Sequence, residues 1–458
     1  MSDQQDPARV PTTTPLWHGT PPDPYQTANQ PIRGQVLDQG VSQVIVTALL
    51  VILAFGAGWF GNLYVNRSNT VPANDPQLAS IIQAYDTISA DYVDPKAIDH
   101  KKMAYAAINA MVDSLGDTGH SRFETPEELA QENSSLQNQP TVGIGVLLSG
   151  GGASPIRIDE VFPNSAADGH LLPGDFIIAV NGTDITGKTI DQTRPLILGQ
   201  EGTTVTLTIK RAGSAQPIVV TLTRKQFTVP LVSMYLIPGL NIADIQLTQF
   251  AENPANTDST DIELRTALKK AAAAGATGII LDLRENPGGY LDQAVLVASE
   301  FIPAGLGHNV FIQRSRTGQT PQAVQSGGLA TATPLTVLVN ENTASAAEIV
   351  TAAIAYNRPS VHVVGAHTFG THTILTTVPL ADGAVILLGT QGWLTPGGVN
   401  AHDTGGLQPD QPVALPASAT EITPLVAIEE QLTQQQLLAS TDTQLQQAIK
   451  DLSPASAG

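Results

Sequence analysis

The 458-residue chain carries 22 basic and 41 acidic side chains, a formal net charge of -19, and apolar residues make up 42% of it. This charge repels polyanions, so no nucleic-acid partner is expected. The absence of cysteine excludes disulfides, cysteine nucleophiles and thiolate metal sites. The nine histidines are scattered without HExxH or similar spacing, so neither a metal site nor a cofactor is predicted. The length predicts about two to four domains.

The chain begins with a polar tail and an uncharged apolar run. Residues 1–40 are rich in Pro, Gln, Thr and Asp without apolar periodicity, which predicts disorder. Residues 41–65 contain no charged side chain, and Trp59, Phe60 and Tyr64 near the far end suit a membrane interface. The alternatives are a buried core helix, which is seldom apolar all round for this length, and a cleaved signal peptide, which needs a short basic segment before the run. The pattern therefore predicts an uncleaved transmembrane signal anchor.

Four further regions follow, each with its own hydrophobic period. Residues 76–138 place apolar side chains three and four apart, which predicts N-terminal helices, and residues 418–458 form a Gln-rich helical region and tail. Residues 139–229 contain short β-branched runs between Gly, Pro and Asn turns, which predicts a small β-rich domain. Strands and helices alternate from 230 to 417, which predicts an α/β domain. Its expected strands are 240–247, 277–284, 333–340 and 360–365, and its expected helices are 259–275, 289–302 and 344–357.

The β-rich region contains a specific resemblance. Asn164 to Ile185, NSAADGHLLPGDFIIAVNGTDI, joins a predicted short helix through PGD to an apolar strand and an Asn-Gly turn, and it closely resembles the middle of a PDZ domain. The resemblance implies that a loop before the second strand binds a peptide's C-terminal carboxylate, and that the peptide adds as an edge strand. A purely structural turn is the alternative for this loop. The matching loop, VGIGV, comprises Val142, Gly143, Ile144, Gly145 and Val146.

Three stretches of the α/β region carry a second resemblance. They are residues 278–295, GIILDLRENPGGYLDQAV, residues 337–350, VLVNENTASAAEIV, and residues 363–374, VVGAHTFGTHTI. Together they resemble the signature of the C-terminal processing, or tail-specific, proteases, the S41 family of serine endopeptidases. The order of anchor, N-terminal helices, PDZ domain, protease core and C-terminal helices is also similar to that family. The resemblance implies a multidomain α+β fold with a ClpP/crotonase-like core.

The second stretch places a serine where a helix is expected to begin. Thr343 is a suitable N-cap, which puts Ser345 beside free backbone N–H groups and the positive end of the helix dipole. From the residues alone, Ser345 is equally an unreactive helix-start serine, and Glu348 is equally a stabilising acidic residue of the first turn. The resemblance assigns the nucleophile to Ser345 and matches Glu348 to an acidic residue that follows it. It assigns the oxyanion donors to the N–H of Ala346 and of Gly288 or Gly289.

The third stretch departs from the family pattern. The family activates its serine with a buried, neutral lysine in TFGKG and supports that lysine with a glutamine four residues on. This chain has Thr371 and Leu375 at those positions, and threonine cannot act as a general base near neutral pH. His372 is a candidate replacement, although in a strand it would face away from the lysine position unless a bulge re-aims it. His367 and His362 are further candidates, and a site without an efficient base is the remaining alternative.

Together these observations predict a single-pass, membrane-anchored serine endopeptidase that recognises C-terminal tails of proteins or peptides. Its PDZ and protease domains are expected on the extracytoplasmic side of the cell membrane, and self-association into a homo-oligomer is left open. The alternative is an inactive pseudoprotease that binds peptides or scaffolds a partner. Thr371 favours this alternative, whereas the retained serine, oxyanion glycines and peptide-binding module favour the enzyme.

Overall fold

The computed structural model describes residues 75–117, 120–253, 258–400, 405–416 and 419–453. The chain divides into two compact units, Met1–Ile98 and Asp99–Gly458. The predicted disordered tail and the predicted anchor at 41–65 lie outside the described residues. Within the ranges given above, no helix is both long and apolar enough to cross a membrane.

The N-terminal region forms helices, as its period predicts. The first unit contains α2 (Pro76–Asp91) and the 3-10 helix η1 (Pro95–Ala97), and the second contains α3 (His100–Asp113) and α4 (Pro126–Leu136). The Asp75 carboxylate caps α2, and Thr125 forms a capping box with Glu128 at the start of α4. These side chains satisfy N–H groups that a helix leaves unpaired at its first turn.

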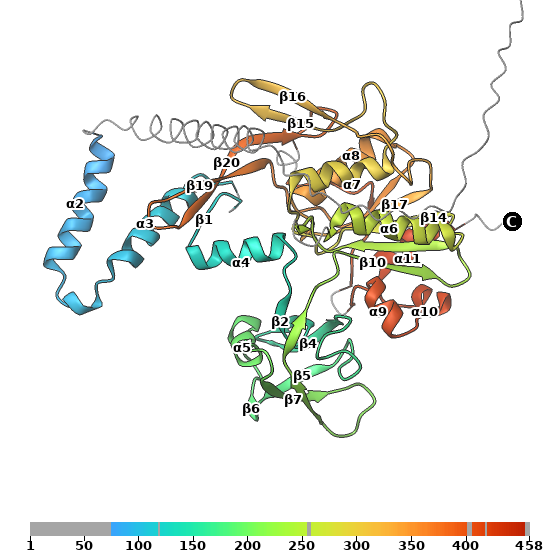
Figure 1. Ribbon diagram of the computed structural model, residues 1–458, viewed down its shortest axis with the longest axis horizontal. Helices are drawn as coiled ribbons and strands as arrows, with labels where there is room; N and C mark the ends of the chain where they lie inside the picture. Colours follow the sequence, from blue (N-terminus) through green and yellow to red (C-terminus); the bar gives the residue numbers. More distant parts are fainter. Residues whose placement is uncertain (1–74, 118–119, 254–257, 401–404, 417–418, 454–458) are drawn as a thin grey trace, which may run out of the picture. The chain divides into compact units, whose positions relative to one another are not determined.

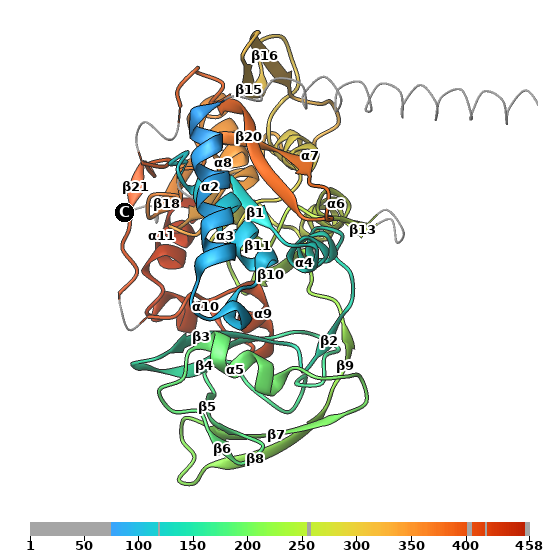
Figure 2. The same cartoon turned by 90° about the vertical axis from the view of Figure 1, so that its left-hand side faces the viewer.

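The β-rich module is built on one antiparallel sheet with the strand order β3-β4-β5-β7-β8. Its strands are β2 (Thr141–Gly143), β3 (Val146–Gly151), β4 (Ser154–Val161), β5 (Phe176–Val180), β6 (Thr183–Asp184), β7 (Thr204–Lys210), β8 (Ile218–Thr223) and β9 (Lys225–Phe227). β6 pairs with β5, and β2 pairs with β9. Helix α5 (Ile190–Ile197) packs beside β3 (Figure 2). β3 is the edge strand of the sheet next to this helix.

The short helix predicted after Asn164 is wrong, because residues 163–170 form turns. Asn164 has a φ of 57°, and its N–H donates to the Asp168 carboxylate at 2.7 Å, which closes a local turn in place of a helical one. The helix of this module is α5, which the sequence analysis did not predict. Pro195 lies inside α5, and an internal proline argues against a helix when only the sequence is considered.

The α/β domain is a six-stranded sheet covered by helices on both faces (Figure 1). Its strands, in spatial order, are β10 (Val232–Ile237), β11 (Ile242–Leu247), β14 (Gly278–Asp282), β17 (Leu335–Val339), β18 (His362–Gly365) and β21 (Gln411–Pro412). Its helices are α6 (Thr260–Ala273), α7 (Leu291–Phe301), α8 (Ala346–Asn357), α9 (Pro424–Glu429), α10 (Gln434–Leu438) and α11 (Thr443–Leu452). β10 runs antiparallel to β11, and the other neighbours are parallel. Every strand and helix expected between 240 and 365 is present.

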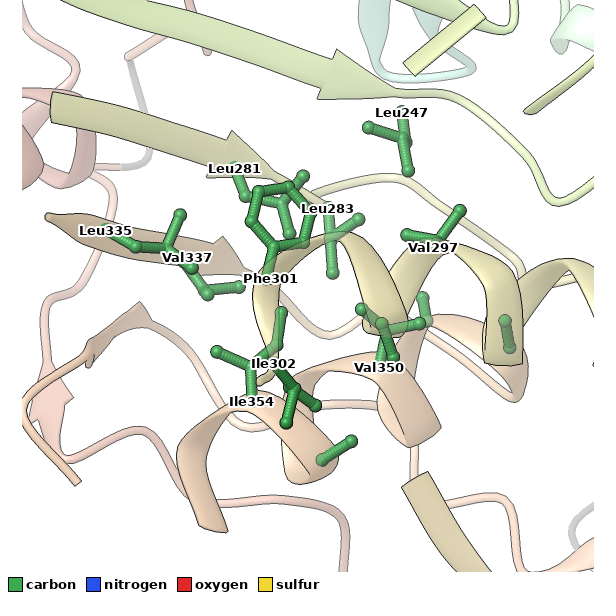
Figure 3. Close-up of a cluster of buried hydrophobic side chains, with 14 of the residues drawn as sticks. Leu247, Leu281, Leu283, Val297, Phe301, Ile302, Leu335, Val337, Val350 and Ile354 are labelled. Carbon is green, nitrogen blue, oxygen red and sulfur yellow. The ribbon is translucent and has the colours of Figure 1, made fainter. Parts of the chain in front are cut away.

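Side chains along each buried strand point alternately to the two faces of the sheet, so each strand packs against both layers of helices. Ile279 and Leu281 of β14 belong to the cluster that includes α6, α7 and α8, whereas Ile280 between them belongs to the cluster with α9, α10 and α11. Figure 3 shows Phe301 of α7 beside Leu281 and Leu283 in the first cluster. A strand buried on both faces is apolar at most of its positions, which is why these runs are readable in the sequence.

A second, more polar sheet was not predicted. It has the order β1-β20-β15-β16, and β19 pairs with β20. A separate two-stranded sheet is formed by the short strands β12 (Glu252–Asn253) and β13 (Asp258–Ser259). The strands of the sheet are β1 (Arg122–Glu124), β15 (Asn309–Ser315), β16 (Gly318–Ala323), β19 (Thr373–Pro379) and β20 (Val385–Leu394). Many of its residues are Thr, Gln and Gly and are only partly buried, so no continuous apolar run marks it.

A buried arginine joins the C-terminal helices to the sheet. The Arg284 side chain is 1% exposed and contacts both carboxylate oxygens of Asp282, with an Nη2 to Oδ2 distance of 2.7 Å. Its Nη1 donates to Asp442 at 2.9 Å, and the Asp442 carboxylate also caps α11 and accepts from the N–H of Ile422. Asp244 lies nearby, and burial, followed by the charge of Asp282, raises its pKa. Arg284 therefore supplies the positive charge that this acidic interior requires.

Arg284→Met should destabilise the protein by about 3–5 kcal/mol, because it leaves the carboxylates of Asp282 and Asp442 buried without a counter-charge. Urea unfolding followed by far-UV circular dichroism measures this change. Arg316→Met, at an exposed position between β15 and β16, is the matched control and should change the free energy of unfolding by less than about 0.5 kcal/mol. Equal unfolding midpoints for the two variants would contradict a structural role for Arg284.

Candidate active site

Two loops meet at the carboxyl ends of the neighbouring parallel strands β14 and β17. The N–H of Ala344 donates to the carbonyl of Asn286 at 2.9 Å, and the Thr343 hydroxyl donates to the carbonyl of Leu283 at 2.8 Å. The Asn286 side chain is fully buried and donates to the carbonyl of Leu247, at the end of β11. Three adjacent strand ends are thereby held together, at the edge where α/β sheets usually place their sites.

Ser345 occupies a strained turn between β17 and α8. Its φ of 53° and ψ of -117° lie outside the regions that L-residues favour, a conformation that costs on the order of 1–3 kcal/mol. A strained strand-to-helix turn is also how other hydrolases present a serine hydroxyl. The side chain is half-buried.

The predicted N-cap at Thr343 is wrong. Helix α8 begins at Ala346, and Ser345 is its N-cap residue. The Thr343 hydroxyl instead accepts from the N–H of Asn340 at 2.9 Å while donating to Leu283. Thr343 therefore ties the two loops together, and the start of the helix is set by Glu348.

The fully buried carboxylate of Glu348 organises the site through five donors. Its Oε2 accepts from the Ser345 N–H at 3.0 Å and from the N–H and hydroxyl of Thr371 at 2.9 and 2.7 Å. Its Oε1 accepts from the Gly370 N–H at 2.8 Å and from the Thr368 hydroxyl. A buried carboxylate is tolerated only when it is hydrogen-bonded in this way, so Glu348 fixes Ser345 and the segment 368–371 with respect to each other.

The two glycines of the NPGG stretch lie against the serine turn. A Cβ at Gly288 would be 2.7 Å from Ser345 Cβ and 2.9 Å from the nitrogen of Ala346, so only glycine fits. The N–H of Gly288 donates to Asn286 Oδ1 at 2.9 Å. In the part of the chain that the structure describes, the N–H groups of Gly289 and Ala346 donate to no protein acceptor.

Thr371 and His372 precede the strand that was expected to carry them. β19 begins at Thr373. His372 therefore lies outside the strand, and strand alternation does not determine which way its side chain points. A register shift does occur in β19, between Ile374 and Leu375, but it lies beyond His372 and cannot re-aim it. Thr371 is 2% exposed, and its hydroxyl accepts from the Ser345 N–H at 2.9 Å while donating to Glu348.

The other candidate histidines have partners of their own. His362 is exposed, and its Nδ1 lies 2.7 Å from the carboxylate of Asp410, a hydrogen bond that raises the histidine pKa. His367 is exposed, with its Nδ1 3.2 Å from the carbonyl of Thr368. Neither contact brings an imidazole to Ser345.

Sequence reasoning missed Asn286, Thr368 and His120. Asn286 and Thr368 lie inside the quoted motifs, each two residues before a glycine, and a polar residue in that position is a signal that could have found them. His120 hydrogen-bonds the Thr373 hydroxyl through Nδ1. Burial lowers its pKa to about 4, and the charges of Arg122 and His372 act in the same direction. His120 therefore lies near His372 and is uncharged at neutral pH.

The loop at Val142 to Val146 is shaped to leave backbone donors open. The carbonyls of Ile144 and Gly145 accept from the N–H groups of Ala167 and Phe162 at 2.8 and 3.0 Å. Among the described residues, the N–H groups of Ile144 and Gly145 have no acceptor. Gly145 has a φ of 78°, and a Cβ there would overlap the Ser165 side chain. The loop ends at the edge strand β3, so it has both features needed to bind a chain terminus.

The arrangement suits acyl transfer. A hydroxyl at a strained turn, with two backbone N–H groups beside it, can attack a carbonyl and stabilise the resulting oxyanion. Across the described ranges, no group of three or more His, Asp or Glu side chains could hold a metal ion.

Comparisons with known proteins agree with this arrangement. The model of peptidase family S41 matches residues 241–413, and a PDZ domain model matches residues 157–211. The carboxy-terminal processing protease CtpA of Bacillus subtilis (strain 168) is 29% identical over 377 residues, which cover 82% of this chain and 76% of that protein. A protein of Staphylococcus aureus (strain COL), described as a probable CtpA-like serine protease, is 30% identical over 391 residues, which cover 84% and 73%.

A solved structure shows the same fold. The chain resembles the crystal structure of an S41 protein from Bacteroides fragilis NCTC 9343 with a TM-score of 0.54 and 19% identity, over 83% of this chain and 98% of that one. The expected order of N-terminal helices, PDZ domain, α/β core and C-terminal helices is thereby confirmed, whereas the anchor lies outside the described residues.

Glu348→Gln should destabilise the protein by about 2 kcal/mol or more, because an amide cannot accept from all the donors that face the carboxylate and leaves some of them unpaired. Urea unfolding measures this. Glu341→Gln, at an exposed position on the same loop, is the control with the same chemical change and should be close to neutral. If the two variants unfold at the same midpoint, Glu348 does not hold the site together.

Proposed function

The chain belongs to peptidase family S41, as a relative of the C-terminal processing proteases with a PDZ domain, and on this premise we propose that it is a membrane-anchored serine endopeptidase that takes C-terminal tails at the PDZ domain and lacks the usual base. The observation that carries the proposal is Ser345, held in a strained strand-to-helix turn beside the Gly288–Gly289 backbone.

In this proposal Ser345 is the nucleophile, and the N–H groups of Ala346 and Gly289 are the oxyanion donors. Sequence reasoning left Gly288 and Gly289 equivalent. The hydrogen bond from the Gly288 N–H to Asn286 favours Gly289, because the Gly288 donor is already used. Gly288 contributes instead by its lack of a side chain, which lets the loop approach Ser345.

Thr371 takes the position of the family lysine and cannot replace it. Its hydroxyl proton is donated to Glu348, and the oxygen accepts from the Ser345 N–H, so the group is engaged as donor and acceptor. Loss of one member of a nucleophile and base pair typically costs about three to six orders of magnitude in rate. The proposed peptidase is therefore slow unless another base acts.

His372 is the proposed candidate for that base. It follows Thr371 directly, and an imidazole has a suitable pKa for taking a hydroxyl proton. His362 and His367 are less favoured, because their ring nitrogens contact Asp410 and the Thr368 carbonyl.

The second candidate function is peptide binding without cleavage. The saturated hydrogen bonding of Thr371 with Glu348 and Ser345 favours it, since the site is stable without a base. Tail recognition depends on backbone donors of the loop at Ile144 and Gly145, which does not require a competent serine.

We also propose that residues 41–65 anchor the chain and that the PDZ and protease domains lie outside the cytoplasm. The uncharged apolar run supports the anchor, and the family resemblance supports the orientation. Protease added to intact cells should digest the part of the chain that follows residue 65. Digestion only after permeabilisation would show that these domains lie in the cytoplasm, opposite to the proposed orientation.

Tail binding should depend on a free carboxylate. Peptides with a free C-terminus and apolar final residues should bind the full chain at least tenfold more tightly than their amidated forms, because the open N–H groups of Ile144 and Gly145 favour a negative charge. Fluorescence anisotropy with labelled peptides measures both affinities. Equal affinity for the acid and amide forms would show that the loop does not recognise the terminal carboxylate.

Restoring the lysine should restore cleavage. Thr371→Lys with Leu375→Gln should raise hydrolysis of a quenched fluorescent peptide by at least tenfold, and Ser345→Ala should abolish the gain. A lysine acts as a base only when neutral, so the gain should increase with pH. Burial lowers the pKa of the introduced lysine, whereas the nearby Glu348 carboxylate raises it. The balance of these two effects sets the pH at which half of the gain in hydrolysis is reached.

Thr376→Lys, at an exposed position on β19, is the matched control and should give no gain. If His372 is the base, the unmodified chain already cleaves, and His372→Ala removes that activity without changing the circular dichroism spectrum. Hydrolysis that survives both Ser345→Ala and His372→Ala would exclude this site.

A further inference from the structure

The PDZ domain contains a cavity that shares no residue with the Val142–Val146 loop. Its volume is about 490 Å³, within the range of small-molecule sites. Strands β4, β5 and β7, whose ends surround it, are labelled in Figure 2. It is lined by residues 152–156, 176–178, 185–188 and 210–214.

One wall is made by the turn between β3 and β4. Gly150, Gly151 and Gly152 all have positive φ angles, of 83°, 97° and 66°, which favour glycine at each position. The N–H of Gly152 donates to the carbonyl of Lys188 at 2.9 Å, and a Cβ at Gly151 would come within 3.2 Å of that same carbonyl oxygen. The glycines thus let the turn pack on the segment that carries Lys188 and define that side of the cavity.

The floor of the cavity is apolar. Ile177 and Val180 of β5 belong to the buried core of the domain, whereas Phe176 and Ile178 are only half-buried and are not part of it. Phe176, Ile177 and Ile178 all line the cavity, and Phe176 and Ile178 keep part of their apolar surface accessible. Ile185 and Pro155 extend this surface.

The rim is cationic. Lys188, Lys210 and Arg211 are the charged residues that line the cavity, all the lining residues are described, and none carries a carboxylate. Arg211 is paired with Asp175 at 2.7 Å. Lys188 and Lys210 form no ion pair with a described residue. Hydrogen bonds from Thr186, followed by the charge of Lys188, lower the pKa of the Asp184 carboxylate, so Lys188 is partly compensated from outside the lining. Lys188 and Lys210 nevertheless bring positive charge to a cavity lined by no carboxylate, in a chain whose net charge is -19.

We propose that this cavity binds an amphiphilic anion, a molecule with an apolar body and a carboxylate or phosphate head group. The apolar body covers Phe176 and Ile178, and the head group accepts charge-assisted hydrogen bonds from Lys188 and Lys210. A polyanion without an apolar part would leave the apolar side chains of the cavity exposed to water. A neutral lipid would leave Lys188 and Lys210 without a counter-charge. A free fatty acid and an anionic membrane phospholipid share the required chemistry.

Photo-crosslinking to the full-length chain tests the proposal. The chain is placed in nanodiscs of phosphatidylcholine, and dodecanoic acid carrying a diazirine is compared with the dodecanol analogue. The labelled peptides are then identified by mass spectrometry. The acid should label segments 152–156 and 210–214 at least tenfold more than the alcohol, and unlabelled dodecanoate should compete.

Charge variants separate the head-group contact from general adhesion. Lys188→Glu with Lys210→Glu should reduce labelling at least tenfold, whereas Lys188→Arg with Lys210→Arg should retain it. Lys269→Glu with Lys270→Glu, which makes the same charge change at exposed positions on α6, should have no effect. Ala212→Trp, at an exposed position of the rim, should block labelling without changing charge. Thermal unfolding by circular dichroism confirms that each variant is folded.

A second arm identifies the source of the ligand. Nanodiscs containing phosphatidylglycerol with a diazirine on its acyl chain should label the same segments if the ligand is a membrane lipid, and labelling by dodecanoic acid alone assigns a soluble amphiphile. The proposal is overturned if the alcohol labels as well as the acid, if charge reversal has no effect, or if the label is spread over the surface as an adventitious additive would be. None of these outcomes depends on the state of Ser345 or on tail binding.

Discussion

The buried carboxylate of Glu348 is the interaction on which the candidate site depends. It accepts from the backbone of Ser345 and from both ends of the segment Thr368 to Thr371. Without those acceptors, the positive-φ backbone of Ser345 would relax toward an ordinary helical start, and the loop before β19 would lose its anchor. The strain at Ser345 persists because the surrounding hydrogen bonds determine its geometry.

Thr371 is held in the site through both functions of its hydroxyl. The threonine hydroxyl supplies one donor and one acceptor. Both are used, one by Glu348 and one by the Ser345 N–H. The shape of the Ser345 turn is therefore maintained by the hydrogen bonds of Glu348 and Thr371 and does not require a basic group at position 371.

The sequence predicted the parts of the fold that are marked by continuous apolar runs. β11, β14, β17 and β18 are buried on both faces, so each run is readable without knowledge of its partners. The second sheet was missed because its polar strands are defined by pairing with β20, a contact between distant segments. The start of β19 and the N-cap role of Ser345 were misplaced for a related reason: both are set by Glu348, whose partners in segment 368–371 lie about twenty residues further along the chain. Ser345, Glu348 and the two glycines were identified from their motifs. Asn286 lies within one of these motifs, whereas His120 lies in none of them and its partner Thr373 is 253 positions away.

The contact between Arg284 and Asp442 also has a consequence for biosynthesis. The two residues are 158 positions apart, so at translation rates of about 5–20 residues per second the ribosome takes roughly 8–30 seconds to add the second after the first. During that interval Asp282 and Asp244 can be buried only against Arg284, with α11 still absent from the opposite face of the sheet. Strand ends and an apolar face stay open until the last helix is made. The face of the central sheet that α11 covers can therefore be closed only after Asp442 has been made, and a chain that stops short of Asp442 lacks this helix.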